Sequence, residues 1–328
     1  MKKNLSPKEI DYFNKIFSAK NFLNLTFELK NIEKMQIICD AIKKTETLKR
    51  ITIIYEKIGK EGMNLLCEAL KINNSITTIE LDASRIGKEE FSTFCDLVRE
   101  KRDLRKLEFS NFYLSKSYFL NSIKENGCFE EISLQFIYFD ESEMNHLNEV
   151  LLRNPKLKIL RLQNNKINKK KLEILLKHIN NSSIERLSLR ENEIEGEGVE
   201  KICKILENNK TMKEIDISKA FFIPKESYKH FVSTLKINNT LETLIYEENN
   251  SYHQEIKLLL ECNKEWSPSL HSSLFKEFRS TLKVFLFCLR EYQCAFNFKI
   301  PKYVVFEIIK RIDRKSYHQF WSINQKEN

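Results

Sequence analysis

Residues 184–198, IERLSLRENEIEGEG, carry apolar residues at a first position and again three, five and ten residues later, at Ile184, Leu187, Leu189 and Ile194. The same hydrophobic pattern returns every 25 to 29 residues along most of the chain. Its eight complete copies begin at Phe22, Leu48, Ile76, Leu104, Phe129, Leu157, Ile184 and Met212, and a ninth, weaker copy begins at Leu241. A fixed period of this length is typical of repeat proteins in which each unit packs on its neighbours, so we predict a solenoid.

Each repeat contains the signal for one strand and one helix. The residues three and five places into the pattern alternate with polar ones, as in a short strand with one buried face. A helical segment follows, and in residues 62–71 the side chains of Leu65, Leu66, Ala69 and Leu70 are spaced to form one buried stripe. Strands and helices that alternate at this period stack into a parallel sheet lined by helices. We therefore predict an α/β right-handed solenoid of about nine repeats.

The turn between strand and helix resembles the ribonuclease-inhibitor-like subfamily of leucine-rich repeat proteins. Its hallmark, NxIGxEG, compares with residues 57–62, KIGKEG, and with residues 192–198, NEIEGEG. The resemblance implies a horseshoe with the sheet on the concave face and the helices on the convex face. It implies no single activity, because the family includes inhibitors, immune receptors, actin-capping regulators and GTPase activators. The Asn that closes the strand turn is matched at Asn165, Asn192 and Asn249, whereas Ser84 and Phe112 replace it elsewhere.

The pattern divides the chain into three parts. Residues 1–21 are expected to form an N-terminal helical cap, opened by a capping box at residues 6–9, SPKE. Residues 22–265 contain the repeats. Residues 266–328 are expected to form a C-terminal helical module, because the period stops after Trp266 and amphipathic helical segments follow. Helices at both ends would cover the apolar surfaces of the terminal repeats.

The composition favours a soluble, cytoplasmic protein. The 55 Lys and Arg residues are interleaved with 46 Asp and Glu residues, and the net charge of +9 is not gathered into a basic stripe. We therefore predict no nucleic-acid partner. No N-terminal apolar run and no stretch of about 18 apolar residues occurs, which predicts no membrane association.

The cysteines favour a structural role. Four of the eight recur at nearly the same place in the helical half of their repeats: Cys39, Cys67, Cys95 and Cys203. A residue that recurs at the repeat period stacks on its neighbours, so we predict a ladder of small buried hydrophobes rather than disulfides. No Cys-x-x-Cys pair occurs and the six His residues are scattered, so we predict no metal site and no cofactor.

We predict that a partner protein binds on the strand residues that point away from the helices. The central outward residues of successive repeats are Thr26, Thr52, Glu80, Glu108, Ser133, Arg161, Ser188, Asp216 and Ile245. With the residues beside them they form an acidic group (Glu80, Asp82, Glu108), a basic group (Arg161, Arg186, Arg190) and a second acidic group that includes Asp216. Alternating charge suits a partner of complementary charge. The alternative is that opposite charges lie side by side on any polar sheet face for solubility alone.

Aromatic residues near the C-terminal strand ends, Tyr55, Phe112 and Phe136, could anchor a partner, although for Phe112 we favour a structural role in the loop that lacks the usual Asn. No phosphate-binding Gly-rich loop, His-Glu-x-x-His or Gly-x-Ser-x-Gly motif occurs. We therefore predict that the protein is not an enzyme. The main expectation is an intracellular protein-interaction scaffold.

Two alternatives rest on resemblance. Residues 300–312, IPKYVVFEIIKRI, resemble the opening of an F-box at Ile300, Pro301, Val304, Ile308 and Ile309, and together with residues 287–290 they resemble a SOCS box. Both families dock a ubiquitin-ligase adaptor through a short helical box, which implies ubiquitin-ligase subunits as partners and a substrate-recognition role. The alternative for this segment is a cap that seals the last repeat.

A third hypothesis is a GTPase activator similar to the Ran-activating members of the repeat family, which usually carry an acidic tail that is absent here.

Overall fold

The computed structural model describes residues 22–25, 32–54, 59–83, 86–221 and 223–265 of the 328-residue chain. The chain divides into two compact units, residues 1–267 and 268–328, and every described residue lies in the first. The two segments predicted as caps, residues 1–21 and 266–328, lie outside the described residues.

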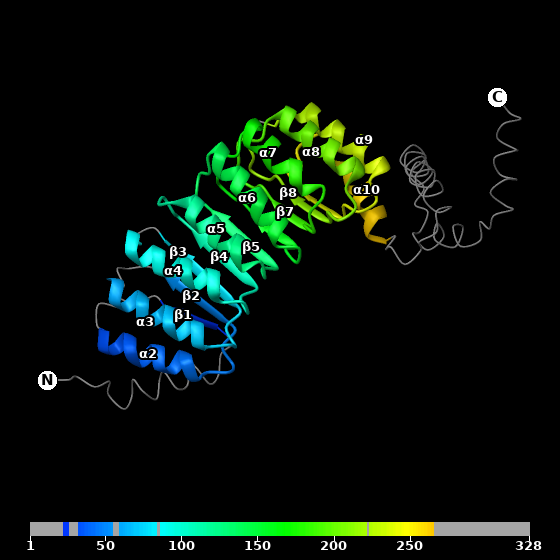
Figure 1. Cartoon of the computed structure of the whole chain (residues 1–328). Helices are drawn as coiled ribbons and strands as arrows, with labels where there is room; N and C mark the ends of the chain where they lie inside the picture. Colours follow the sequence, from blue (N-terminus) through cyan, green and yellow to red (C-terminus); the bar gives the residue numbers. More distant parts are fainter. Residues whose placement is uncertain (1–21, 26–31, 55–58, 84–85, 222, 266–328) are drawn as a thin grey trace, which may run out of the picture. The chain divides into compact units, whose positions relative to one another are not determined.

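Nine strands form one parallel sheet in this described part, and each strand pairs with the next one along the chain (Figure 1). The strands are β1 (Phe22–Leu25), β2 (Arg50–Ile54), β3 (Thr78–Asp82), β4 (Lys106–Ser110), β5 (Glu131–Gln135), β6 (Ile159–Arg161), β7 (Arg186–Ser188), β8 (Glu214–Asp216) and β9 (Thr243–Ile245). The helices that follow them are α2 (Ile32–Lys44), α3 (Gly59–Ile72), α4 (Lys88–Glu100), α5 (Lys116–Asn126), α6 (Glu141–Arg153), α7 (Lys169–Ile179), α8 (Gly196–Asn208), α9 (Lys229–Ile237, after the 3-10 turn Lys225–Tyr228) and α10 (His253–Glu265).

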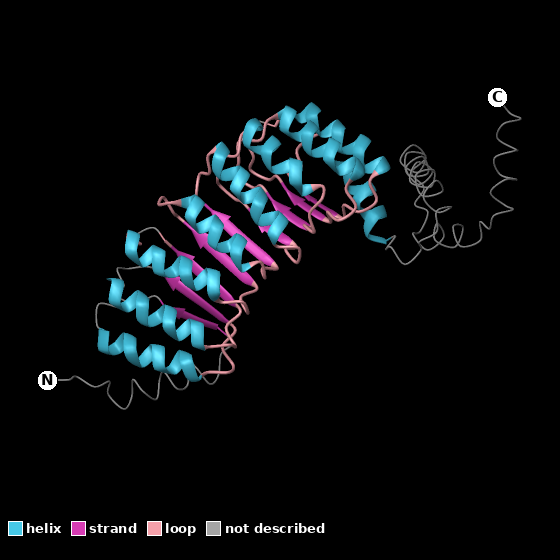
Figure 2. Ribbon diagram, viewed as in Figure 1, coloured by secondary structure: helices cyan, strands magenta, loops and turns pink. Residues whose placement is uncertain are grey.

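The helices cover one face of the sheet. Figure 2 shows them packed side by side on that face, with no described helix on the other face. The predicted α/β architecture, one strand and one helix per repeat, is therefore confirmed.

The register between strands follows the hydrophobic pattern from β2 onward. The apolar residues three places into the pattern lie opposite one another in successive strands: Ile51, Ile79, Leu107, Ile132, Leu160, Leu187, Ile215 and Leu244. In β1 the prediction was wrong by two residues, because Asn24 rather than Thr26 pairs with Thr52, and Leu25 pairs with Ile53. Leu23, Leu25 and Phe27 alternate with polar residues, so a shift of two keeps apolar residues on the same face and the pattern does not select between the two registers.

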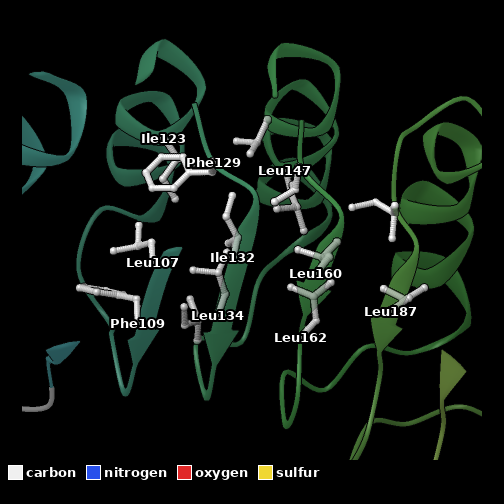
Figure 3. Packing of buried hydrophobic residues seen from close by; sticks show 14 of the residues in the cluster. Leu107, Phe109, Ile123, Phe129, Ile132, Leu134, Leu147, Leu160, Leu162 and Leu187 are labelled. Carbon is white, nitrogen blue, oxygen red and sulfur yellow. The ribbon is translucent and has the colours of Figure 1, made fainter. Parts of the chain in front are cut away.

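The core lies between the sheet and the helices. In Figure 3, Leu107 and Phe109 of β4 lie beside Ile132 and Leu134 of β5, and Ile123 of α5 lies on the helix side. All five side chains are buried. Each contributes about 1.5 to 3 kcal/mol by leaving water, and truncating one such Leu to Ala costs about 2 to 5 kcal/mol. The same layer is repeated along the sheet, so the solenoid has one continuous core.

Buried asparagines join successive repeats where the helices end. Asn73 Nδ2 donates to the carbonyl oxygens of Ile42 and Thr45 in the preceding repeat, both at 2.7 Å, and Asn73 Oδ1 accepts from the Ile76 amide at 2.8 Å. Asn126 and Asn238 make the equivalent bonds to carbonyl oxygens of their own preceding repeats. We name this position, three residues before the start of each hydrophobic pattern, the helix-end ladder. Its buried asparagines are Asn73, Asn126, Asn154, Asn209 and Asn238.

A second set of asparagines closes the strand turns. Asn165 Oδ1 accepts from the Ile137 amide at 2.8 Å, and Asn192 Oδ1 accepts from the Ile167 amide at 3.0 Å, each in the preceding repeat. Asn249 does not share this role, because its side chain is exposed. There, Glu247 Oε1 accepts from the Lys219 amide of the preceding repeat at 3.1 Å.

Phe112 replaces asparagine in its repeat and is fully buried. Its ring stacks on Phe91 at 4.2 Å between centroids and lies 5.2 Å from Phe109 in an edge-to-face arrangement. The structural role predicted for Phe112 is therefore confirmed. Aromatic packing replaces the hydrogen bonds that an asparagine would have made.

The cysteine ladder is confirmed in the described residues. Cys39, Cys67, Cys95 and Cys203 lie on α2, α3, α4 and α8 as buried free thiols. Burial raises the pKa of Cys39, Cys67 and Cys203 to about 12. At neutral pH these thiols are protonated and act as small apolar side chains.

No helix among the described residues is long and apolar enough to cross a membrane.

Candidate functional site

The helix-free side of the sheet carries the residues predicted to meet a partner. Strand β3 shows the alternation directly, since Ile79 and Leu81 are buried whereas Thr78, Glu80 and Asp82 are partly exposed. We name the surface formed by such outward residues the open sheet face. Its central row, in register across β2 to β9, is Thr52, Glu80, Glu108, Ser133, Arg161, Ser188, Asp216 and Ile245. The small side chains of Ser133 and Ser188 in this row are buried.

Glu80 and Glu108 lie directly opposite each other on β3 and β4. Glu80 is held by Arg50, whose Nε lies 3.3 Å from Glu80 Oε1, and by Thr52, whose Oγ1 donates to Oε2 at 2.8 Å. Its side chain is only 19% exposed. These contacts compensate the repulsion between the neighbouring carboxylates of Glu80 and Glu108. The Glu80 carboxylate is therefore used mainly in contacts within the sheet.

The other two members of the acidic group also have partners. Asp82 Oδ2 accepts from Asn111 Nδ2 at 3.1 Å. Glu108 Oε1 accepts from Gln135 Nε2 at 3.3 Å, and Glu108 Oε2 lies 3.8 Å from Lys106 Nζ. Glu108 is nevertheless 36% exposed, so one carboxylate of the group remains open to solvent.

A chain of opposite charges crosses β4, β5 and β6. Lys106 Nζ lies 3.0 Å from Glu131 Oε1, and the same carboxylate pairs with Arg161 Nη1. Burial lowers the pKa of Lys106, and the positive charge of Arg161 adds to this effect. In this part of the sheet, opposite charges lie side by side across neighbouring strands. Arg161 therefore belongs to an internal network as well as to the predicted basic group.

The rest of the basic group is more available. Arg186, at the start of β7, is exposed and makes no side-chain ion pair or hydrogen bond within the described residues. Arg190 follows β7 and is 38% exposed, with Glu191 Oε1 at 3.2 Å from its Nε. On the next strand Asp216 is held by serines, since Ser188 Oγ donates to it at 3.2 Å and Ser218 Oγ at 2.7 Å. Arg186 and Arg190, on and just after β7, and Asp216 on β8 therefore belong to neighbouring repeats and differ in their internal pairing.

An aromatic pair at the C-terminal strand edge, Tyr113 and the half-buried Tyr138, was not identified from the sequence. Tyr113 is 66% exposed, and its ring centroid lies 6.3 Å from that of Tyr138. Lys166 Nζ lies 4.9 Å from the centre of the Tyr138 ring. Tyr138 has a φ of 57°, a left-handed conformation that is unusual for an aromatic residue and turns its side chain at the strand end. Of the aromatic residues that were predicted, Phe136 is half-buried and Tyr55 lies outside the described residues.

The predicted adaptor box, Ile300, Pro301, Val304, Ile308 and Ile309, also lies outside the described residues.

Comparisons with known proteins agree with the repeat architecture. A family model described as a leucine-rich repeat matches residues 180–203, which include β7 and the first turns of α8. A search of the curated proteins found no match. Among solved structures, the leucine-rich repeat-containing protein LegL7 from Legionella pneumophila matches with a TM-score of 0.54 and 14% identity, over 79% of this chain and 87% of that one. This match supports the fold.

Two further solved structures match less well. A protein from Bacteroides fragilis has a TM-score of 0.44 and 15% identity, over 70% of this chain and 74% of that one. Leiomodin-1 actin-binding site 2 has a TM-score of 0.42 and 21% identity, over 44% of this chain and 87% of that one.

Proposed function

We propose that this leucine-rich repeat protein is a protein-binding scaffold that captures a partner protein on its open sheet face. The observation that carries the proposal is the exposed Arg186, a charged side chain on that face with no ion pair or hydrogen bond in the described residues. A charge without an internal partner contributes nothing to the sheet network, whereas it can pair with an acidic group on another protein.

The neighbouring charges give the proposed surface its pattern. Arg190 and Arg161 are each about one-third exposed, at 38% and 33%, and Asp216 lies on the next strand. Glu80, Asp82 and Glu108 form the acidic end of the same surface. Because Glu80 is largely committed to Arg50 and Thr52, we expect Glu108 to be its most available carboxylate.

The aromatic pair Tyr113 and Tyr138 supplies apolar contact area at one edge of this surface. Aromatic residues carry much of the energy in protein interfaces, and the ring of a tyrosine buries area at a low cost in side-chain entropy. An interface that begins at these rings and extends across the sheet would combine aromatic anchors with complementary charge.

The test compares partner capture by matched variants. Arg186→Gln combined with Arg190→Gln removes two charges from the open sheet face, and Lys170→Gln removes an exposed charge from α7 on the helix side. Immobilised full-length chains would be exposed to native cell lysate, and the captured proteins quantified by mass spectrometry. We expect a specific set of proteins to fall by about tenfold, or 1.4 kcal/mol, with the double variant and to be unchanged with Lys170→Gln.

Thermal unfolding of each variant provides the control for folding. Since Arg186 has no partner in the described residues and Arg190 pairs only with its neighbour Glu191, we expect the unfolding free energy to change by less than about 0.5 kcal/mol per substitution. Identical capture by the unmodified chain, the double variant and Lys170→Gln would contradict the proposal. It would indicate that the charges of the open sheet face contribute only to solubility.

A further inference from the structure

The helix-end ladder is interrupted at one repeat. Asn181 holds the ladder position in sequence, six residues before Leu187, as Asn209 lies six residues before Ile215. The other ladder asparagines are buried, but Asn181 is exposed. The interruption therefore comes from the local structure and not from the loss of the residue.

The cause is the early end of α7. This helix ends at Ile179, two residues before Asn181, whereas α6 ends at Arg153 and α8 at Asn208, each directly before its ladder asparagine. After Ile179 the chain forms a tight turn in which the Ser182 amide donates to Ile179 O at 3.1 Å and Ser182 Oγ accepts from the Ile184 amide at 3.3 Å. Ser182 thus accepts the hydrogen bond from the Ile184 amide that the ladder asparagine accepts in other repeats, and the Asn181 side chain is exposed.

The next repeat is left with an unpaired donor. Asn209 Nδ2 is buried and has no hydrogen-bond partner among the described residues, whereas Asn238 Nδ2 one repeat later donates to Leu206 O at 2.7 Å and Asn209 O at 3.2 Å. A buried amide without an acceptor is unfavourable. The chain retains this defect beside two surface hollows.

The hollows lie on either side of the C-terminal end of α7. One, of about 760 Å³, is formed by the segments that lead into β5 to β8, and the other, of about 420 Å³, lies between α7 and α8. Leu176 and Ile205 line the second hollow, and the hydroxyl-bearing Ser182, Ser183 and Thr211 line the first. We name the two hollows together the α7 notch.

The charge of the α7 notch is predominantly positive. Its lining contains seven lysines and three glutamates. Lys158 and Lys213 pair with Glu185 at 3.1 and 2.9 Å, and Lys201 pairs with Glu173 at 2.7 Å. The other four lysines are exposed and have no ion pair within the described residues: Lys156, Lys177, Lys204 and Lys210.

We propose that the α7 notch is a second interaction surface, which binds an acidic peptide segment of a partner protein. Four unpaired lysines distributed over two neighbouring hollows suit several carboxylates spaced along an extended chain. The hydroxyls of Ser182, Ser183 and Thr211 already donate to carbonyl oxygens of the chain, so the lysines supply the donors for such a peptide. None of the described residues that line the two hollows is aromatic, so they offer the bases of a nucleic acid no ring on which to stack.

This inference goes beyond the proposed function and does not depend on it. The notch is formed by helices and by the segments that precede the strands, whereas the open sheet face is formed by outward strand residues. The double variant Arg186→Gln and Arg190→Gln should therefore bind an acidic peptide as the unmodified chain does.

Fluorescence anisotropy of the full chain with labelled peptides tests the proposal. The probe is a peptide of alternating Glu and Gly, roughly ten residues or about 35 Å when extended, and the matched peptide contains Gln in place of Glu. We expect saturable binding of the Glu peptide alone. It should weaken by about tenfold when Lys156, Lys177, Lys204 and Lys210 are all changed to Gln, and it should weaken as salt is added.

A control variant removes charge elsewhere. Lys49→Gln with Lys88→Gln removes two exposed lysines from earlier repeats and should leave peptide binding unchanged. Absence of Glu-peptide binding, or an equal loss in the control variant, would overturn the proposal. Lysine-dependent binding of RNA or of vesicles containing phosphatidylserine, without binding of the Glu peptide, would also overturn it.

Discussion

Lys101 occupies the position that asparagine holds in the helix-end ladder of most described repeats. Its side chain is 1% exposed, and its Nζ donates to the carbonyl oxygen of Asn73 in the preceding repeat and pairs with Asp103 Oδ2 at 2.9 Å. Asn126 Nδ2 makes the corresponding bond, to Lys101 O at 2.8 Å. A buried ammonium group thus replaces a neutral amide, and burial lowers the pKa of Lys101.

We therefore expect Lys101→Asn to be at least as stable as the unmodified chain at pH 7. Asparagine restores the neutral donor without the cost of burying a charge, whereas Lys101→Met leaves the Asn73 carbonyl without this donor and should cost about 1 to 3 kcal/mol. Urea unfolding at pH 7 measures both differences. A large loss of stability in Lys101→Asn would show that the ammonium group itself is needed.

The pH dependence of this comparison has a definite sign. The pKa of Lys101 is lower in the folded chain than in the unfolded chain, so between the two values the unfolded state binds more protons and stability rises with pH. The lysine form therefore gains stability up to about pH 10.4, the unfolded pKa. Any advantage of Lys101→Asn should shrink as the pH rises toward that value.

At the residue scale, the sequence predicted which side chains are buried better than it predicted which side chains interact with one another. The buried positions of Cys39 and Phe112 follow from their places in the repeat and were predicted. The exposure of Asn249 and the pairing of Arg161 with Glu131 were not, because they depend on loop geometry and on the rotamers of long side chains, which a hydrophobic period does not specify. For the charges of the open sheet face, the sequence left two alternatives open, partner binding and charges that lie side by side for solubility alone. The observed ion pairs show that some of these charges are paired within the sheet.

At the scale of strands and helices, the period of the hydrophobic pattern predicted most of the strand register and the helix positions. The register of β2 to β9 follows the repeated pattern, because each strand carries two apolar residues that must face the helices. The register of β1 was wrong by two residues, since three alternating apolar residues allow both alignments. The early end of α7 was also missed, because Asn181 matches the ladder in sequence and the outward turn depends on hydrogen bonds made by Ser182.

The cysteine ladder gives a test at this scale. Cys39, Cys67, Cys95 and Cys203 are buried on α2, α3, α4 and α8, and burial raises their pKa, so the reactive thiolate is scarce and inaccessible. We expect these four to resist iodoacetamide at pH 8 in the folded chain while the partly exposed Cys128 is modified, as measured by peptide mass spectrometry. In urea all five should react. Rapid modification of the four in the folded chain would contradict the packing of α2, α3, α4 and α8.

At the scale of the whole described unit, the repeats separate stability from binding. The layer between sheet and helices is apolar and continuous, so the outward strand residues are free to vary in charge without disturbing the core. The repeat pattern therefore predicts where a binding surface lies but not what it binds, because the identity of the partner depends on outward side chains that the fold does not constrain. Tyr113 and Tyr138 illustrate this limit, since they lie in loops beyond the strand alternation.

The most direct test of binding on the open sheet face is site-specific photo-crosslinking. A photoreactive amino acid is placed at position 186 on that face or at position 170 on α7, and each full-length chain is irradiated in native lysate. We expect a discrete covalent adduct with a partner protein from position 186 that is absent from position 170. Adducts of equal yield from both positions, or none from position 186 while the partner is still captured, would contradict this expectation.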